Sequence, residues 1–201
     1  MELQKAISQI SEIHAQVLRS EVFRGCRALP MAVTSLLALT AATAQTTVLR
    51  PADLVDSLWL WIGYAVLCAF ICGADLVLHC WVRDRRFRQQ AGFVVAQFVP
   101  AVVAGVLLTA VLIDQPANAH LLPGLWTAVF ALGIFSARPY LPRALGWVAA
   151  FYLAAGAFLL WSADTGTLIP AWSMGLTFGA GQAAAAYVLH DSHGERPSGS
   201  A

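Results

Sequence analysis

The placement of the basic residues constrains this chain more than any other feature of its sequence. Long apolar stretches alternate with short polar loops, and eleven of the twelve Lys and Arg residues fall in every second loop. Basic loops of membrane proteins stay in the cytoplasm. The sequence therefore predicts an all-α polytopic membrane protein, a six-helix bundle with both termini cytoplasmic. The eleven residues are Lys5, Arg19, Arg24, Arg27, Arg83, Arg85, Arg86, Arg88, Arg138, Arg143 and Arg196, and Arg50 alone falls on the other side.

The composition favours lipid as the solvent for most of the chain. It is 59% hydrophobic and 11% charged, whereas soluble domains carry about 25% charged residues. The basic residues cluster at helix ends and form no surface stripe, which argues against nucleic-acid binding. The overall look is that of a small bacterial protein of the inner (cytoplasmic) membrane, so the lipid bilayer is the expected partner.

Six apolar stretches approach the length of about 20 helical residues that crosses a bilayer. Residues 1–25 precede them and place apolar side chains at helical spacing, which predicts an amphipathic cytoplasmic or interfacial helix. Residues 191–201 are polar and are predicted to form a disordered cytoplasmic tail. The predicted spans, within a transmembrane domain of residues 26–190, are 30–48, 58–82, 93–113, 121–137, 144–161 and 168–188.

The second span carries a polar stripe at steps of three and four residues, which one helix face would hold. Asp75 is the only carboxylate within a predicted span, and a buried charge in a membrane is costly and commonly functional. It could hold the ring of His79 in one tautomer or neutralise Arg83. The other interpretation is an ordinary cluster at the cytoplasmic end of the span. The stripe consists of Trp61, Tyr64, Cys68, Cys72, Asp75, His79 and Arg83.

Polar residues of other spans are expected at a similar depth. Asp75, His79, Arg83, Gln97 and Gln182 form the candidate binding cluster, which would line a cavity open to the cytoplasm. Alternatively, each makes a local bond between helices. Ligands stacked along one helix cannot close a metal tetrahedron, and no catalytic motif is present. We therefore predict no catalytic residue, no metal site and no cofactor.

Small residues in the last span indicate close helix packing. Gly175 and Gly179 lie one turn apart, a spacing that lets helix backbones approach. The face would pack the last two spans together within the monomer, or it would form the seam of a homo-oligomer.

Three classes of function remain open. The first is a non-enzymatic transport or channel-like subunit with a polar cavity facing the cytoplasm. The second is an interaction or sensing protein that engages a cytoplasmic protein partner through the N-terminal helix and the Arg83–Arg88 loop. The third is a membrane enzyme acting on a lipid or quinone through Asp75 and His79.

Overall fold

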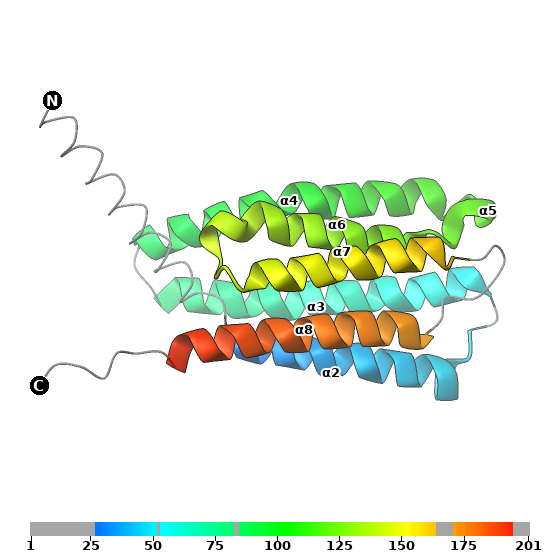
Figure 1. Ribbon diagram of the computed structural model, residues 1–201, viewed down its shortest axis with the longest axis horizontal. Helices are drawn as coiled ribbons and strands as arrows, with labels where there is room; N and C mark the ends of the chain where they lie inside the picture. Colours follow the sequence, from blue (N-terminus) through cyan, green and yellow to red (C-terminus); the bar gives the residue numbers. More distant parts are fainter. Residues whose placement is uncertain (1–26, 52, 83–84, 164–170, 195–201) are drawn as a thin grey trace, which may run out of the picture.

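The chain is all helical over the residues that the computed structural model describes, which are 27–51, 53–82, 85–163 and 171–194. Figure 1 shows the long helices lying side by side, each running opposite to its neighbour in the chain. The bounds of the helices are α2 Ala28–Ala44, continued by a π-helical turn Gln45–Leu49; α3 Leu54–Val82; α4 Arg85–Leu112; α5 Pro116–Ala119; α6 Leu122–Ala137, followed by a 3₁₀ turn Arg138–Tyr140; α7 Leu145–Trp161; and α8 Ala171–Gly194.

The helices cover the described parts of the six apolar stretches, and several of their ends differ from the predicted ones. α3, for example, begins at Leu54 and not at residue 58. We expected a loop between the second and third spans, over residues 83–90. The chain is helical again from Arg85, and only residues 83–84 lie between the end of α3 and the start of α4. The first residues of the expected tail, 191–194, are helical, because α8 continues to Gly194. The predicted helix over residues 1–25, together with Arg83 and residues 195–201, lies outside the described residues.

Proline positions explain where several helices begin and end. Pro30 and Pro123 lie in the first turns of α2 and α6, where the missing N–H is not needed. Pro139 and Pro142 fall in the short connection between α6 and α7. Because proline lacks a backbone N–H and its ring clashes with the preceding turn, the two residues end α6 there. Pro100 is the exception, because α4 is continuous through it.

The alternating helix directions bring the ends of the helices together in two groups. The end where α2, α4 and α7 begin and α3, α6 and α8 end is called the basic end (Figure 1). The opposite end holds the connections after α2, α4 and α7. The described cations at the basic end are Arg27, Arg88, Arg138 and Arg143, whereas the opposite end carries Arg50, Asp53, Asp56 and Asp114.

Small residues set the closest helix contacts. α2 packs most extensively against α8, and α6 against α7. A Cβ atom added to Gly175 would lie 2.5 Å from the Cβ of Ala42, and one added to Gly156 would lie 2.9 Å from the backbone nitrogen of Ala128. Between α2 and α8 the Ser35 hydroxyl also donates a 2.7 Å hydrogen bond to the carbonyl of Gly179.

A chain of aromatic rings closes the middle of the bundle. Phe178 of α8 meets Tyr64 of α3, Tyr152 of α7 and Phe130 of α6, with ring centroids 5.6–6.2 Å apart. Phe130 in turn contacts Phe98 of α4 at 5.6 Å. These edge-to-face and tilted contacts join five helices.

The outer surface is apolar over much of its length. Few described residues of α3 and α4 are buried, and many of their large apolar side chains are exposed. Water would not tolerate a continuous apolar surface of this size. Within the described part of the chain, three helical segments are long and apolar enough to cross a membrane, and α7 is apolar but shorter. The three segments are Ala28–Leu49, Leu54–His79 and Ala91–Leu112.

Candidate functional site

The polar face of α3 is turned toward the bundle. Its members recur every three or four residues and are buried or half-buried. The positions on the other side of the helix, among them Gly63, Val66, Phe70 and Gly73, are exposed. The helix therefore hides its polar side chains and presents its apolar ones. The face comprises Ser57, Trp61, Tyr64, Cys68, Cys72, Asp75 and His79.

At the basic end, Asp75 and His79 meet a cation from another helix. Arg27, which directly precedes α2, places its Nη1 3.3 Å from Oδ1 of Asp75 and 3.0 Å from Nε2 of His79. The side chain of Asp75 is 21% exposed and that of Arg27 is 43% exposed. The cluster formed by Arg27, Asp75 and His79 is therefore half-buried and accessible from the basic end.

The contacts of His79 determine its tautomer. A guanidinium has only donors, so Nε2 of His79 must accept the hydrogen bond from Arg27. The proton then sits on Nδ1, which donates to the backbone carbonyl of Asp75 at 2.8 Å. In this arrangement the charge of Asp75 is balanced by Arg27.

The middle of the α3 face meets α2 and α8, where the ring of Tyr64 contacts that of Phe178. The hydroxyl of Tyr64 donates to the carbonyl of Thr34 at 3.2 Å, and Cys68 lies four residues further along the same face. Tyr152 of α7 is 1% exposed, and its hydroxyl donates a long 3.5 Å bond to the carbonyl of Phe178. Polar atoms thus continue inward from the basic end.

A buried network closes the opposite end of the α3 face. The indole N–H of Trp61 donates to Oε1 of Gln45 at 2.9 Å. The amide of Gln45 donates to the hydroxyl of Ser57 at 3.5 Å. Gln45 opens the π-helical turn that ends α2, and Arg50 follows that turn with a left-handed φ of 35°. π-Helical turns often occur at functional positions.

The five residues of the predicted binding cluster have different positions. Asp75 and His79 lie together as described, and Arg83 lies outside the described residues. Gln97 is exposed on α4, whereas Gln182 is buried in α8. No hydrogen bond or ion pair between described side chains joins either glutamine to Asp75 or His79.

Sequence reasoning missed the partners of the polar face that lie on α2. Arg27 was counted only as a topology marker, although its position just before the first span places it at the depth of His79. Counting residues inward from the basic end of each span would have placed Arg27 beside His79 and identified it as a partner. No sequence signal identifies Gln45 as a partner of the polar face.

Gly175 and Gly179 pack against α2 within the monomer. Gly175 meets Ala42, and a Cβ at Gly179 would lie 3.0 Å from the Leu39 side chain. We expected these two glycines to pack the last span against the span before it. That prediction was wrong for both of them, because they pack against α2. Gly181, which faces Tyr152, is the glycine of α8 that contacts α7. The homo-oligomer stays a prediction.

Among the described residues, no three His, Cys, Asp or Glu side chains lie close enough together to hold a metal ion. Comparison with family models, with curated proteins and with solved structures gave no significant match.

Proposed function

We propose that the chain crosses the bacterial inner membrane six times, with its basic end in the cytoplasm. The alternating helix directions and the concentration of arginines at one end support this orientation. The exposed apolar surfaces of α3 and α4 support contact with lipid. α7, with 17 residues, would span about 25 Å at 1.5 Å per residue, which fits a locally thin bilayer.

Within that membrane frame, the protein acts as a non-enzymatic transport or channel-like subunit with a polar path that opens to the cytoplasm. The observation that carries this proposal is the α3 face, which keeps polar atoms inside the bundle from His79 to Ser57. Polar side chains in a membrane commonly mark the route of an ion or a substrate. The only carboxylate on this face is Asp75, so it would be the charged group that a transported species meets first.

The chemistry of the face suits a proton or a small cation. Polar side chains recur along the face every three or four residues, from His79 to Ser57. Trp61 is 1% exposed and blocks the opposite end together with Gln45. The arrangement therefore corresponds to a path that is open toward the cytoplasm and closed toward the other side.

Flux measurements in proteoliposomes test the proposal. Asp75→Asn, which keeps the shape of the side chain and removes its charge, is expected to abolish proton or cation flux while the protein still inserts. Asp75→Glu is expected to retain part of the flux. Asp56→Asn is the matched control, since Asp56 is exposed on the same helix near the opposite end. Equal flux in the wild type and in Asp75→Asn would contradict a transport path along α3.

A second candidate function is an interaction or sensing role at the cytoplasmic surface. It is favoured by Arg27, which joins residues 1–26 directly to the cluster with Asp75 and His79. A protein bound to the N-terminal residues would then act on α3 through one ion pair. Deletion of residues 1–25 is expected to release a co-purifying cytoplasmic protein without unfolding the bundle. Retention of that protein would contradict this role.

A further inference from the structure

One amide side chain of α4 lies on the outer surface of the bundle. α4 runs along one edge of the molecule (Figure 1) and packs most extensively against α6. On that side Phe98 contacts Phe130, and a Cβ added to Gly133 would meet Phe98 and Ala101. The side chain of Gln97 is exposed, and it has no hydrogen-bond partner within the described part of the chain.

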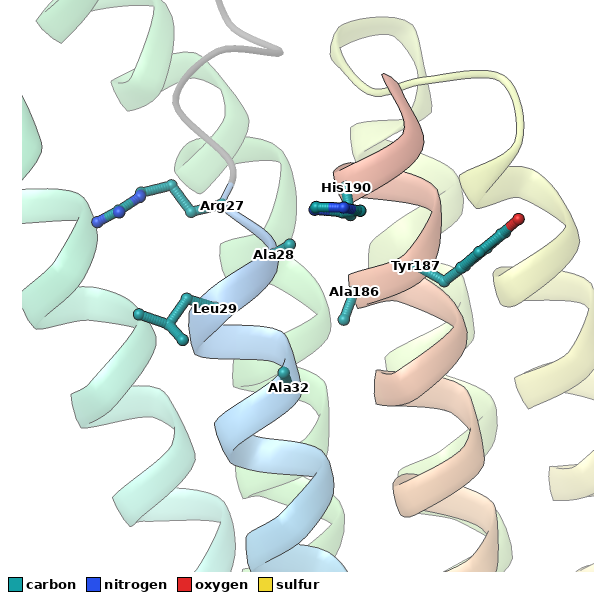
Figure 2. Close-up of a pocket in the computed structure, with 7 residues that line it drawn as sticks. All are labelled: Arg27, Ala28, Leu29, Ala32, Ala186, Tyr187 and His190. Carbon is teal, nitrogen blue, oxygen red and sulfur yellow. The ribbon is translucent and has the colours of Figure 1, made fainter. Parts of the chain in front are cut away.

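Other polar side chains near the bundle surface reach partners within the chain. Arg27 extends away from α8 (Figure 2) and contacts Asp75 of α3. The hydroxyl of Thr40, exposed on α2, donates to the carbonyl of Leu37 on its own helix at 2.9 Å. Such bonds let a polar side chain face lipid at little cost. Gln97 differs from these residues because its amide is left for a group outside the described chain.

A backbone carbonyl beside Gln97 also lacks its usual donor. Pro100 lies inside α4 and has no backbone N–H. The carbonyl of Ala96, four residues earlier, therefore loses the helical N–H donor that it would otherwise have. Ala96, Gln97 and Pro100 are all exposed. The outer face of α4 thus presents a side-chain amide and a backbone acceptor within one helical turn.

Both groups lie at a depth where lipid offers no hydrogen bond. The apolar segment of α4 begins at Ala91, so Gln97 lies about 9 Å inside it at about 1.5 Å per residue. Hydrocarbon supplies neither donors nor acceptors, and backbone groups released by a proline in a membrane helix are satisfied by neighbouring helices. An amide at this depth likewise bonds across to another helix. The outer face of α4 therefore favours a protein partner over acyl chains.

A second copy of the chain supplies the groups that this face requires. An amide carries two N–H donors and an acceptor oxygen, so two Gln97 side chains can each donate to the other. Copies inserted in the same orientation place Gln97 at the same depth. A twofold axis along the membrane normal then brings the two amides together. The second N–H of each amide is left for the Ala96 carbonyl of the other copy.

We propose that two copies of the chain pair in the membrane through the outer face of α4, with their Gln97 amides hydrogen bonded to each other and to the Ala96 carbonyls. The proposal rests on the membrane crossing given above and is independent of transport. It uses a different face from Gly175 and Gly179, which α2 covers within the monomer. The exposed residues that would pack around the amides are Phe93, Pro100, Val103 and Leu107.

Energy transfer between labelled copies tests the pairing. Full-length protein with a donor or an acceptor dye at its C-terminus is reconstituted in vesicles of phosphatidylcholine and phosphatidylglycerol, and lipid is added to dilute it. The wild type is expected to follow a monomer–dimer curve. Gln97→Leu keeps the side chain's size and removes the amide, and it is expected to raise the dissociation constant about tenfold. Gln97→Asn retains an amide and is expected to keep part of the pairing.

Pro100→Ala tests the contribution of the backbone carbonyl. It returns an N–H donor to the carbonyl of Ala96, and it is expected to weaken pairing about threefold. A merely structural role of Pro100 would not predict this loss, because alanine is the better helix former. Thr40→Val is the matched control, since it removes an exposed polar group that already bonds to its own helix. Thr40→Val is expected to pair like the wild type.

Three results would overturn the α4 dimer. The first is energy transfer in the wild type at the level of random mixing. The second is the same dissociation constant for the wild type and Gln97→Leu, because pairing would then use another face. The third is loss of a different membrane protein from Gln97→Leu with no energy transfer in the wild type, which would assign the face to that protein. Absence of pairing in a chain whose topology reporters give opposite sides would contradict the dimer alone, whereas reporters on one side would contradict the membrane crossing itself.

Discussion

Arg27 and Asp75 are 48 positions apart in the chain, and their side chains lie 3.3 Å apart where α2 begins and α3 ends. This ion pair fixes the relative height of the two helices at the basic end. It also gives Asp75 a cation from a different helix, so the charge of the α3 face is balanced between two elements. A change at either residue therefore alters both packing and the electrostatics of the face.

The ion pair predicts a measurable coupling energy. A double-mutant cycle with Arg27→Gln and Asp75→Asn is expected to give about 0.5–1 kcal/mol in the free energy of unfolding, because both side chains remain partly exposed. Unfolding of the purified protein in detergent measures each corner of the cycle. Strictly additive effects would mean that the two side chains do not interact.

Gly175 is predicted to be intolerant of even one methyl group. Gly175→Ala would place a Cβ 2.5 Å from the Cβ of Ala42, and overpacking of this kind costs about 1–3 kcal/mol. Gly73→Ala is the matched control, because nothing lies within 4 Å of a Cβ at that position. The control is expected to be neutral or to gain up to about 1 kcal/mol from better helix propensity. Equal stability of the two variants would contradict the close approach of α2 and α8.

Trp61 is predicted to stabilise the opposite end through its indole N–H. Trp61→Phe keeps an aromatic ring but leaves Oε1 of Gln45 without this donor, which costs about 1–2 kcal/mol for a buried acceptor. Trp59→Phe is the comparison, since Trp59 is 59% exposed on the same helix. Thermal unfolding in detergent should separate the two variants, and a loss of similar size in both would argue against the buried network.

Phe178 is predicted to be the central ring of the aromatic chain. Phe178→Ala removes its contacts with Tyr64, Phe130 and Tyr152 and is expected to cost about 2–4 kcal/mol through lost burial and a cavity. Phe70→Ala serves as the control, because Phe70 is 72% exposed and faces outward. A denaturation series in detergent measures both, and a larger loss for Phe70→Ala would contradict the assignment of inner and outer faces.

The helical ranges could be predicted because apolar length and turn residues are local properties of the sequence. The prediction that the α3 stripe faces inward also follows from local spacing, and burial of Trp61 and Ser57 agrees with it. The early start of α4 could not be read in this way, since a basic, polar segment resembles a loop even when it extends a helix. α4 also continues through Pro100, although a proline inside a helix commonly kinks or ends it.

The neighbours of each helix could not be predicted, because they depend on packing between distant segments. The sequence offered His79 and Arg83, both in the second predicted span or at its end, as partners of Asp75. Arg83 lies outside the described residues, and the structure brings Arg27, which precedes α2, to Asp75. Gln97 has the same polar character as Gln182, but it lies on an exposed face while Gln182 is buried. Periodicity defines a face and leaves open which helix will cover it.

Topology reporters test the central claim, that the helices cross a membrane with the basic end in the cytoplasm. Fusions at Gln89 and at Asp164 should report opposite sides of the bilayer, with Gln89 cytoplasmic and Asp164 external. Both positions on one side, or recovery of the intact chain as a soluble monomer without detergent, would contradict the account.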